Sequence, residues 1–221
     1  MQIVPLSNTN FESKNIPIKP YTLKTKNGVL NISEVTKQEL KSIKFFKEVI
    51  ETFFKNLSKS STDPLFKFYK TDHAKYIKRK PQLYMGYRKN LNKNLDSNPN
   101  RTFLVARDDK GHIQAICDTS ENYWVPNTGN SLYVRNFVVN DAYKRQGVGK
   151  SMLETIINAS KNSFENVYLH STKGAIDFYK HLDFKELDKS NTTHNNILKY
   201  LKENSQEYQG GHIFPMIRET L

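Results

Sequence analysis

Cysteine is nearly absent from this 221-residue sequence, which contains one, Cys117. A single cysteine cannot form a disulfide within the chain, and the sequence has no cysteine or histidine spacing typical of a zinc site. Long apolar runs are missing too, since no stretch approaches the about 18 residues of a membrane-spanning helix and residues 1–10 do not resemble a signal peptide. We therefore expect a cytoplasmic chain stabilised by packing, with no metal and no membrane contact.

Acidic residues are scarce relative to basic ones. The sequence has 22 Asp and Glu against 34 Lys and Arg, a formal net charge of +12. This excess favours approach to anions such as nucleotide cofactors, RNA or acidic proteins, although a lysine-rich solvated surface explains the charge equally well. With 37% apolar and 12% aromatic residues, the chain has enough apolar material for one folded domain.

The N-terminal half has few clear elements. Residues 1–27 contain Pro5, Pro17 and Pro20 and little periodicity, which indicates an irregular arm, so we place a single domain at residues 28–221. After a short strand at residues 28–35, apolar residues at spacings of three and four predict a helix over residues 37–57. The Asp63-Pro64 pair is typical of a second helix start, and the Asn- and Lys-rich segment 89–101 is typical of a loop.

The second half alternates strands and helices, which predicts an α/β fold. Strand patterns and a turn signature at residues 108–111 predict strands at residues 102–107, 112–119, 131–139, 166–170 and 212–218. Apolar stripes predict helices from Val148 to about Ile157, from Ala175 to Leu182 and at residues 197–202.

A glycine-containing segment, KRQGVGK at residues 144–150, joins the strand at 131–139 to the next helix. Free N–H groups and the helix dipole meet at such a start, and glycine lets a phosphate approach the backbone. A Walker A loop needs a glycine where Lys144 stands, and the dinucleotide fingerprint needs one where Met152 stands. A tight connection that binds nothing is the remaining alternative.

Two segments carry a resemblance: residues 138–149, VVNDAYKRQGVG, and residues 169–184, LHSTKGAIDFYKHLDF. The first resembles the acetyl-CoA pyrophosphate loop of GNAT-type N-acetyltransferases, with Lys144 in place of an Arg or Gln. The second resembles that family's fifth strand and fourth helix, with Asp183 in place of a glycine. The resemblance covers residues 102–184 and implies a mixed, mostly antiparallel central sheet of six to seven strands flanked by helices, with an N-terminal extension.

The resemblance also implies acetyl-CoA as cosubstrate, with its pantetheine arm between two strands that splay apart. The residues expected to bind it are Phe137, Val138, Val139, Lys144, Arg145, Gln146, Gly147, Val148, Gly149, Lys150 and Thr172. A backbone N–H near residues 137–139 is expected to polarise the thioester carbonyl, and Tyr179 is expected to protonate the departing sulfur. Without the resemblance, we would assign Tyr179 to the core.

The general base is less clearly marked. His170, at the end of a strand that faces the expected cleft, is the first candidate, and Asp118, Glu121 or a water chain are alternatives. Tyr123 and Trp124 precede the strand at 131–139, where they can line an acceptor pocket or anchor packing.

The acceptor amine is not identified by the sequence. Residues 37–101, which the resemblance places around the acceptor, are rich in lysine, and residues 71–101 contain two acids, Asp72 and Asp96. This charge favours a large or anionic acceptor over a small polyamine or an aminoglycoside. Two other functions stay open: a basic acetyltransferase acting on aminoacyl-tRNA or a ribosome-associated protein, and a non-catalytic CoA-binding interaction module. The sequence is also compatible with a homodimer.

Overall fold

The computed structural model describes residues 18–42, 44–45, 48–49, 52, 102–121, 125–126, 128–211 and 213–220. The strands in these ranges are β1 (Tyr21–Thr25), β2 (Gly28–Glu34), β3 (Thr102–Arg107), β4 (Ile113–Glu121), β5 (Ser131–Val139), β6 (Asn166–Ser171), β7 (Lys185–Glu186) and β8 (Phe214–Glu219). The helices are α1 (Lys37–Lys41), α5 (Val148–Ser160), α6 (Ile176–Lys180), α7 (Thr192–Asn204) and α8 (Gln206–Gln209), with 3-10 turns η1 (Asp141–Tyr143) and η2 (Lys173–Ala175).

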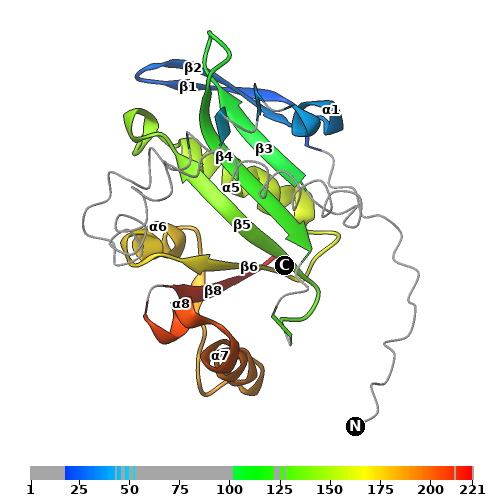
Figure 1. The fold of residues 1–221 in the computed structure, drawn as a ribbon, viewed down its shortest axis with the longest axis vertical. Helices are drawn as coiled ribbons and strands as arrows, with labels where there is room; N and C mark the ends of the chain where they lie inside the picture. Colours follow the sequence, from blue (N-terminus) through cyan, green and yellow to red (C-terminus); the bar gives the residue numbers. More distant parts are fainter. Residues whose placement is uncertain are drawn as a thin grey trace.

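The strands form one sheet with the order β1-β2-β3-β4-β5-β6-β8-β7 (Figure 1). Its neighbouring strands pair antiparallel except β5 and β6, which pair in parallel. The parallel pair needs a crossover, and α5 supplies it. The predicted mixed, mostly antiparallel sheet is therefore confirmed, with eight strands in place of six or seven.

One additional strand is β1, in the segment expected to be an irregular arm. Residues 21–25 alternate between half-buried and exposed positions, and the strand pairs with β2 over its whole length. Tyr21 and Leu23 pack against the main core, while Thr22 and Lys24 face solvent. The prolines that suggested irregularity end at Pro20, directly before the strand, where proline is tolerated.

Helix α5 covers one face of the sheet. Its buried residues recur on one side of the helix: Val148, Met152, Leu153, Ile156, Ile157 and Ser160. They pack against inward-facing residues of the central strands, among them Leu132 and Val134 of β5 and Leu169 of β6. Apolar contact therefore holds the crossover helix against this face of the sheet.

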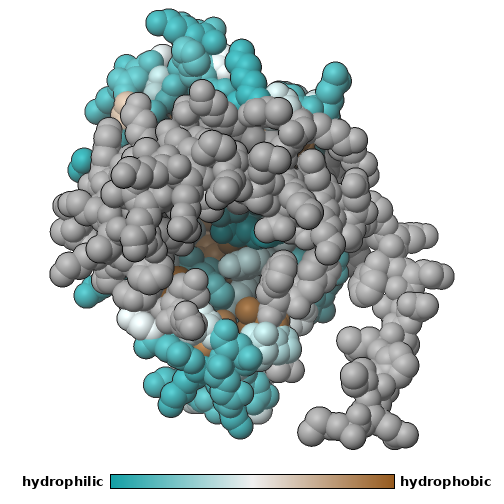
Figure 2. All heavy atoms as spheres, in the orientation of Figure 1, coloured by the Kyte–Doolittle hydropathy of each residue, from teal (hydrophilic) through white to brown (hydrophobic). Residues whose placement is uncertain are grey.

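The opposite face carries two smaller apolar clusters. One joins α1 and Phe45 to residues of β3, β4 and β5, and the other joins Ile197 and Leu201 of α7 to Tyr168 of β6. Helix α7 begins earlier than expected because the Asn191 side chain accepts a hydrogen bond from the His194 N–H and caps it. Its outer side is hydrophilic (Figure 2).

The expected helix over residues 37–57 is interrupted. Ser42 has an extended backbone (φ −76°, ψ 127°) and ends α1. Its hydroxyl accepts from the N–H of Phe45, and residues 44 and 45 are helical again. The expected second helix and the loop at 89–101 lie outside the described residues, as do residues 1–17 of the arm. Within the described ranges, no helix has both the length and the apolar character that crossing a bilayer requires.

Candidate active site

The parallel strands β5 and β6 separate beyond their first residues. They pair from Ser131 and Asn166 as far as Val134 and Leu169, whereas β5 continues to Val139 and β6 to Ser171. A register shift in the β4–β5 ladder lies at the same level, since Asp118 pairs with Asn136 and Thr119 with Val134. This bulge leaves one extra residue in β5 and turns the strand away from β6 (Figure 1).

Backbone groups of β5 point into the resulting gap. The N–H of Asn140 donates to the carbonyl of Gln114 on β4, at 2.7 Å. Because successive residues of a strand point their N–H and C=O groups to opposite edges, those of Phe137 and Val139 point away from β4, toward the gap. The β6 pairing has ended by this point, so these groups are available to a ligand.

The β5–α5 loop forms one end of the gap. It passes through η1, where the Asn140 side chain accepts from the Ala142 N–H at 3.4 Å, and then through two left-handed residues, Arg145 (φ 58°) and Gly147 (φ 81°). Gly147 is the N-cap of α5, and no described side chain caps this end of the helix. The N–H groups of its first turn therefore face the loop, where an anion can accept from them.

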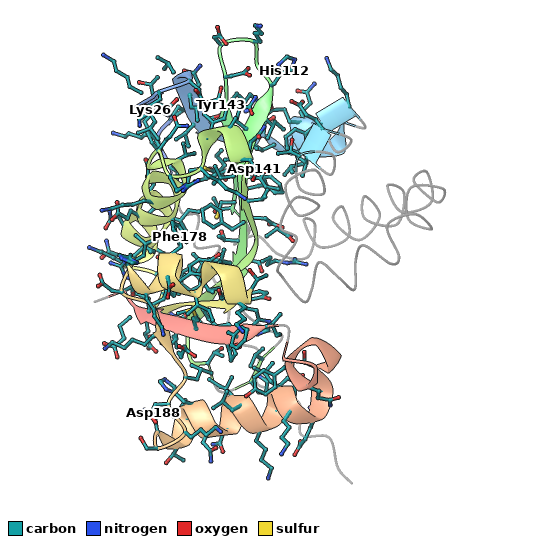
Figure 3. All side chains as sticks on the ribbon, turned by 90° about the vertical axis from the view of Figure 1, so that its left-hand side faces the viewer. Lys26, His112, Asp141, Tyr143, Phe178 and Asp188 are labelled. Carbon is teal, nitrogen blue, oxygen red and sulfur yellow. The ribbon has the colours of Figure 1, made fainter. Side chains whose placement is uncertain are left out.

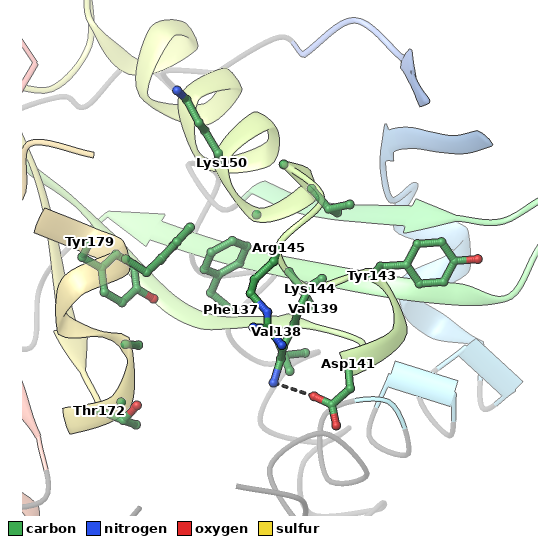
Figure 4. Close-up of a pocket in the computed structure, with 16 residues that line it drawn as sticks. Phe137, Val138, Val139, Asp141, Tyr143, Lys144, Arg145, Lys150, Thr172 and Tyr179 are labelled. Atoms are coloured by element: carbon green, nitrogen blue, oxygen red, sulfur yellow. Dashed lines mark ion pairs between the residues drawn. The ribbon is translucent and has the colours of Figure 1, made fainter. Parts of the chain in front are cut away.

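A pocket of about 800 Å³ occupies the gap and the loop (Figure 4). Its lining contains Phe137, Val138, Val139, Asp141, Tyr143, Lys144, Arg145, Gly147, Val148, Gly149, Lys150, Thr172, Gly174, Ala175, Phe178 and Tyr179. Every predicted cosubstrate contact except Gln146 is among them, and so is Tyr179. The sequence did not suggest Phe178, although its place before Tyr179 in the second motif was a usable signal.

Glycine at position 149 allows a close approach between α5 and two aromatic rings. A β-carbon there would lie 3.3 Å from ring atoms of both Phe137 and Phe178. The two rings lie 6.0 Å apart between centroids and belong to different arms of the pocket, β5 and α6. Because Gly149 has no side chain, the first turn of α5 can pack directly against the rings of Phe137 and Phe178.

The charges around the loop are partly paired. Lys144 forms an ion pair with Asp141 at 2.6 Å, and both residues line the pocket (Figure 4). Lys150 lies 3.8 Å from Glu154 on the exposed side of α5. The loop therefore offers basic side chains to an anion, with Asp141 competing for Lys144.

Tyr179 lies at the apolar end of the pocket. It is 7% exposed and makes edge contacts with the rings of Phe178 and Phe184. Burial raises the pKa of Tyr179, and nearby Cys117 and Tyr133 add to the effect. Burial therefore favours the protonated phenol.

His170 lies outside the pocket lining. Its neighbour Leu169 faces the α5 core, and because side chains alternate along a strand, His170 faces the other side of the sheet. There the Tyr168 hydroxyl lies 2.7 Å from Nε2 and the Tyr133 hydroxyl 3.4 Å from Nδ1. The expected position at the cleft is thus corrected to the opposite face, next to Tyr133.

The other predicted site residues also lie away from the pocket lining. The Gln146 side chain bonds to the β1–β2 turn and to the carbonyl of Ala142. Asp118 is fully buried and accepts from the Asn136 amide at 3.0 Å, and Glu121 ends β4. Tyr123 and Trp124 lie outside the described residues.

Comparison with known proteins assigns the central part of the chain. Residues 99–186 match the family model described as an acetyltransferase (GNAT) domain. These 88 of the 221 residues are similar to a GNAT acetyltransferase domain. The matched range contains both motifs and the whole pocket lining, and it ends with β7.

Solved structures resemble the chain over a longer stretch. A GNAT-family acetyltransferase from Staphylococcus aureus Mu50 has 16% identity and a TM-score of 0.55, over 87% of this chain and 99% of that one. The PaiA N-acetyltransferase from Thermoplasma acidophilum, in complex with coenzyme A, has 13% identity and a TM-score of 0.53, over 86% of this chain and 98% of that one. At such identities the likeness shows the fold alone. No curated protein matches the sequence.

The match agrees with the predicted family over residues 99–186, where the family model describes an acetyltransferase domain. The roles of individual residues and the nature of the acceptor stay predictions.

Proposed function

We propose that this protein transfers the acetyl group of acetyl-CoA directly to an amine, with the cosubstrate lying in the pocket between β5 and β6. The observation that carries the proposal is the continuity of that pocket, which runs from the uncapped start of α5 to the buried hydroxyl-bearing ring of Tyr179. An anion-binding end and a dry apolar end match the two ends of acetyl-CoA. The coenzyme A complex of the Thermoplasma relative supports this choice of cosubstrate.

The cosubstrate is placed by its chemistry. The pyrophosphate accepts from N–H groups at Gly147–Lys150, with Arg145 and Lys144 around it. The pantetheine arm follows the edge of β5, where the outward-pointing groups of Phe137 and Val139 can bond to its amides. The same row of N–H groups polarises the thioester carbonyl, because a donor at this position stabilises the oxyanion that forms on attack.

The transfer needs one proton removed from the amine and one proton supplied to the departing sulfur. The neutral amine attacks the carbonyl carbon, the C–N bond forms, and the C–S bond breaks as the tetrahedral intermediate collapses. Tyr179 gives its hydroxyl proton to the departing sulfur. Burial disfavours the charged tyrosinate, but it also disfavours a bare thiolate in the same place. The proton is therefore shared between the phenol oxygen and the sulfur as the C–S bond breaks, and Tyr179 afterwards regains a proton from the acceptor side of the site.

His170 is the proposed base. It lies on the sheet face opposite α5, where the Tyr133 hydroxyl is 3.4 Å from its Nδ1. Tyr168 holds Nε2 and fixes the orientation of the ring. The amine proton reaches His170 through the Tyr133 hydroxyl or a water, with no need for the imidazole to enter the pocket.

A panel of amines tests the reaction and its acceptor. The purified protein is incubated with acetyl-CoA and with spermidine, kanamycin, free amino acids, acidic peptides or aminoacyl-tRNA, and thiol release is measured. We expect turnover of a large or anionic acceptor, because residues 71–101 carry few acids to bind a polycation. Efficient turnover of spermidine or kanamycin would refute the acceptor class, and the absence of thiol release with every amine, together with no binding of coenzyme A, would refute the function.

A further inference from the structure

The loop between β5 and α5 has a backbone that its own sequence does not favour. Arg145 has a φ of 58°, in the left-handed region that a residue with a β-carbon rarely adopts. Its neighbour but one, Gly147, has a φ of 81°, which glycine adopts without a steric penalty. A left-handed arginine persists where surrounding contacts fix the backbone on both sides of it. The contacts around Arg145 therefore determine how the β5–α5 loop keeps this backbone.

The contacts come from the N-terminal hairpin and from the Gln146 side chain. The N–H of Lys26 donates to Gln146 Oε1 at 2.9 Å, and Gln146 Nε2 donates to the Ala142 carbonyl at 2.6 Å. The side-chain amide of Asn27 donates to the same carbonyl. We call these three hydrogen bonds the hairpin contact. They fix Ala142 and Gln146, on either side of the left-handed Arg145. Lys26 and Gln146 lie 120 positions apart in the sequence.

The turn that makes these bonds is itself well fixed. The Thr25 hydroxyl donates to the Gly28 carbonyl at 2.7 Å and accepts from the N–H of Asn27 at 3.2 Å. On the same hairpin, the Tyr21 hydroxyl accepts from Ser151 and Thr155 of α5, each at 3.1 Å. Figure 3 shows Lys26 and Tyr143 at the same end of the molecule. The hairpin is thus bonded both to the loop and to the helix that follows it.

We propose that the hairpin contact holds the pyrophosphate loop in the shape that presents the N–H groups of α5 to acetyl-CoA, and that Gln146 and Asn27 are positioning residues for this cosubstrate. Neither is among the described residues that line the pocket, so both act through the loop backbone. A loop held in its binding shape pays no ordering cost when the ligand arrives. The proposal rests on the proposed function, because it assumes that the loop binds the pyrophosphate.

The test compares Gln146→Met and Asn27→Ala with a control on the same hairpin, Thr22→Ala, whose side chain is exposed. Gln146→Met keeps the side-chain length, adds no charge and removes two of the three bonds. We expect its Kd for coenzyme A, measured by calorimetry, to rise about tenfold, the scale of two lost hydrogen bonds. Inhibition by pantetheine, which has no pyrophosphate, and kcat at saturating acetyl-CoA should not change.

The two substitutions should also be non-additive. Asn27 and Gln146 share the Ala142 carbonyl, so the double variant should bind coenzyme A little worse than the poorer single variant. Thr22→Ala should behave as wild type in every assay. Thermal unfolding checks that each variant is folded at the assay temperature.

Each alternative result has a distinct meaning. If the wild type fails to bind coenzyme A, the proposed function fails, and this inference fails with it. If the wild type binds but Gln146→Met binds equally well, the positioning role is refuted and the proposed function stands. An equal loss of coenzyme A and pantetheine binding would likewise overturn the inference, because it would show a general loosening of the fold.

Discussion

Substituting Gly147 by alanine tests whether the shape of the loop serves binding, and Gly111 provides a matched control. Both glycines have left-handed backbones (φ 81° and 79°), and an added β-carbon meets no atom within 4 Å at either. The cost of alanine is therefore the backbone penalty alone, about 1–2 kcal/mol at each position. Gly111 lies in the β3–β4 turn, away from the pocket lining, whereas Gly147 caps α5 within it.

The two variants should lose similar stability and differ in binding. For a chain of this size, each kcal/mol lowers Tm by about 2–4 °C. Gly111→Ala should keep the wild-type affinity for coenzyme A, measured by calorimetry. Gly147→Ala should bind about tenfold more weakly, because an alanine that leaves the left-handed region turns the N–H groups of α5 away from the pyrophosphate. Equal affinities in the two variants, with equal losses in Tm, would show that the loop does not hold the cosubstrate.

Three further predictions concern the pocket and the buried titratable groups. Tyr179→Phe should keep coenzyme A affinity and lower kcat about 100-fold, since one proton donor is lost; an unchanged kcat would make Tyr179 structural. Asp141→Asn frees Lys144 from its 2.6 Å ion pair and should tighten coenzyme A binding about 2- to 5-fold at low salt, whereas weaker binding would mean that the pair orients Lys144. Burial raises the pKa of Cys117, Tyr168 and Tyr179, so the folded state keeps protons that the unfolded state loses. The free energy of unfolding should therefore fall as pH rises above about 8.5, and more steeply above about 10, with a smaller fall in Tyr179→Phe.

The part of the fold that could be predicted is the part encoded by short-range patterns. The order from β5 through α6 follows from a β-branched strand, a glycine turn and an apolar stripe, all within about one helix or strand length. The same segment contains both motifs, and 11 of the 16 residues that line the pocket are among those that the sequence predicts. Gly149 belongs to the first motif and Phe178 to the second, and the local structure of each motif places these two residues next to each other at the pocket.

The errors came from contacts between distant segments. Strand β1 exists because residues 21–25 find β2 and the α5 core, which periodicity over five residues cannot establish. Gln146 was assigned to the cosubstrate because nothing in the sequence connects it to Lys26. His170 was placed at the cleft because alternation along β6 fixes which residues share a face but not which face holds the pocket.

Titration of the purified protein with coenzyme A, beside the Gly149→Val variant, tests the account most directly. The wild type should bind one coenzyme A per chain. Gly149→Val should stay folded and bind at least about tenfold more weakly, because its β-carbon would already lie 3.3 Å from the Phe137 and Phe178 rings and its methyl groups would push them into the pocket. No binding by the wild type, or equal affinity in the folded variant, would contradict the claim that this pocket holds acetyl-CoA.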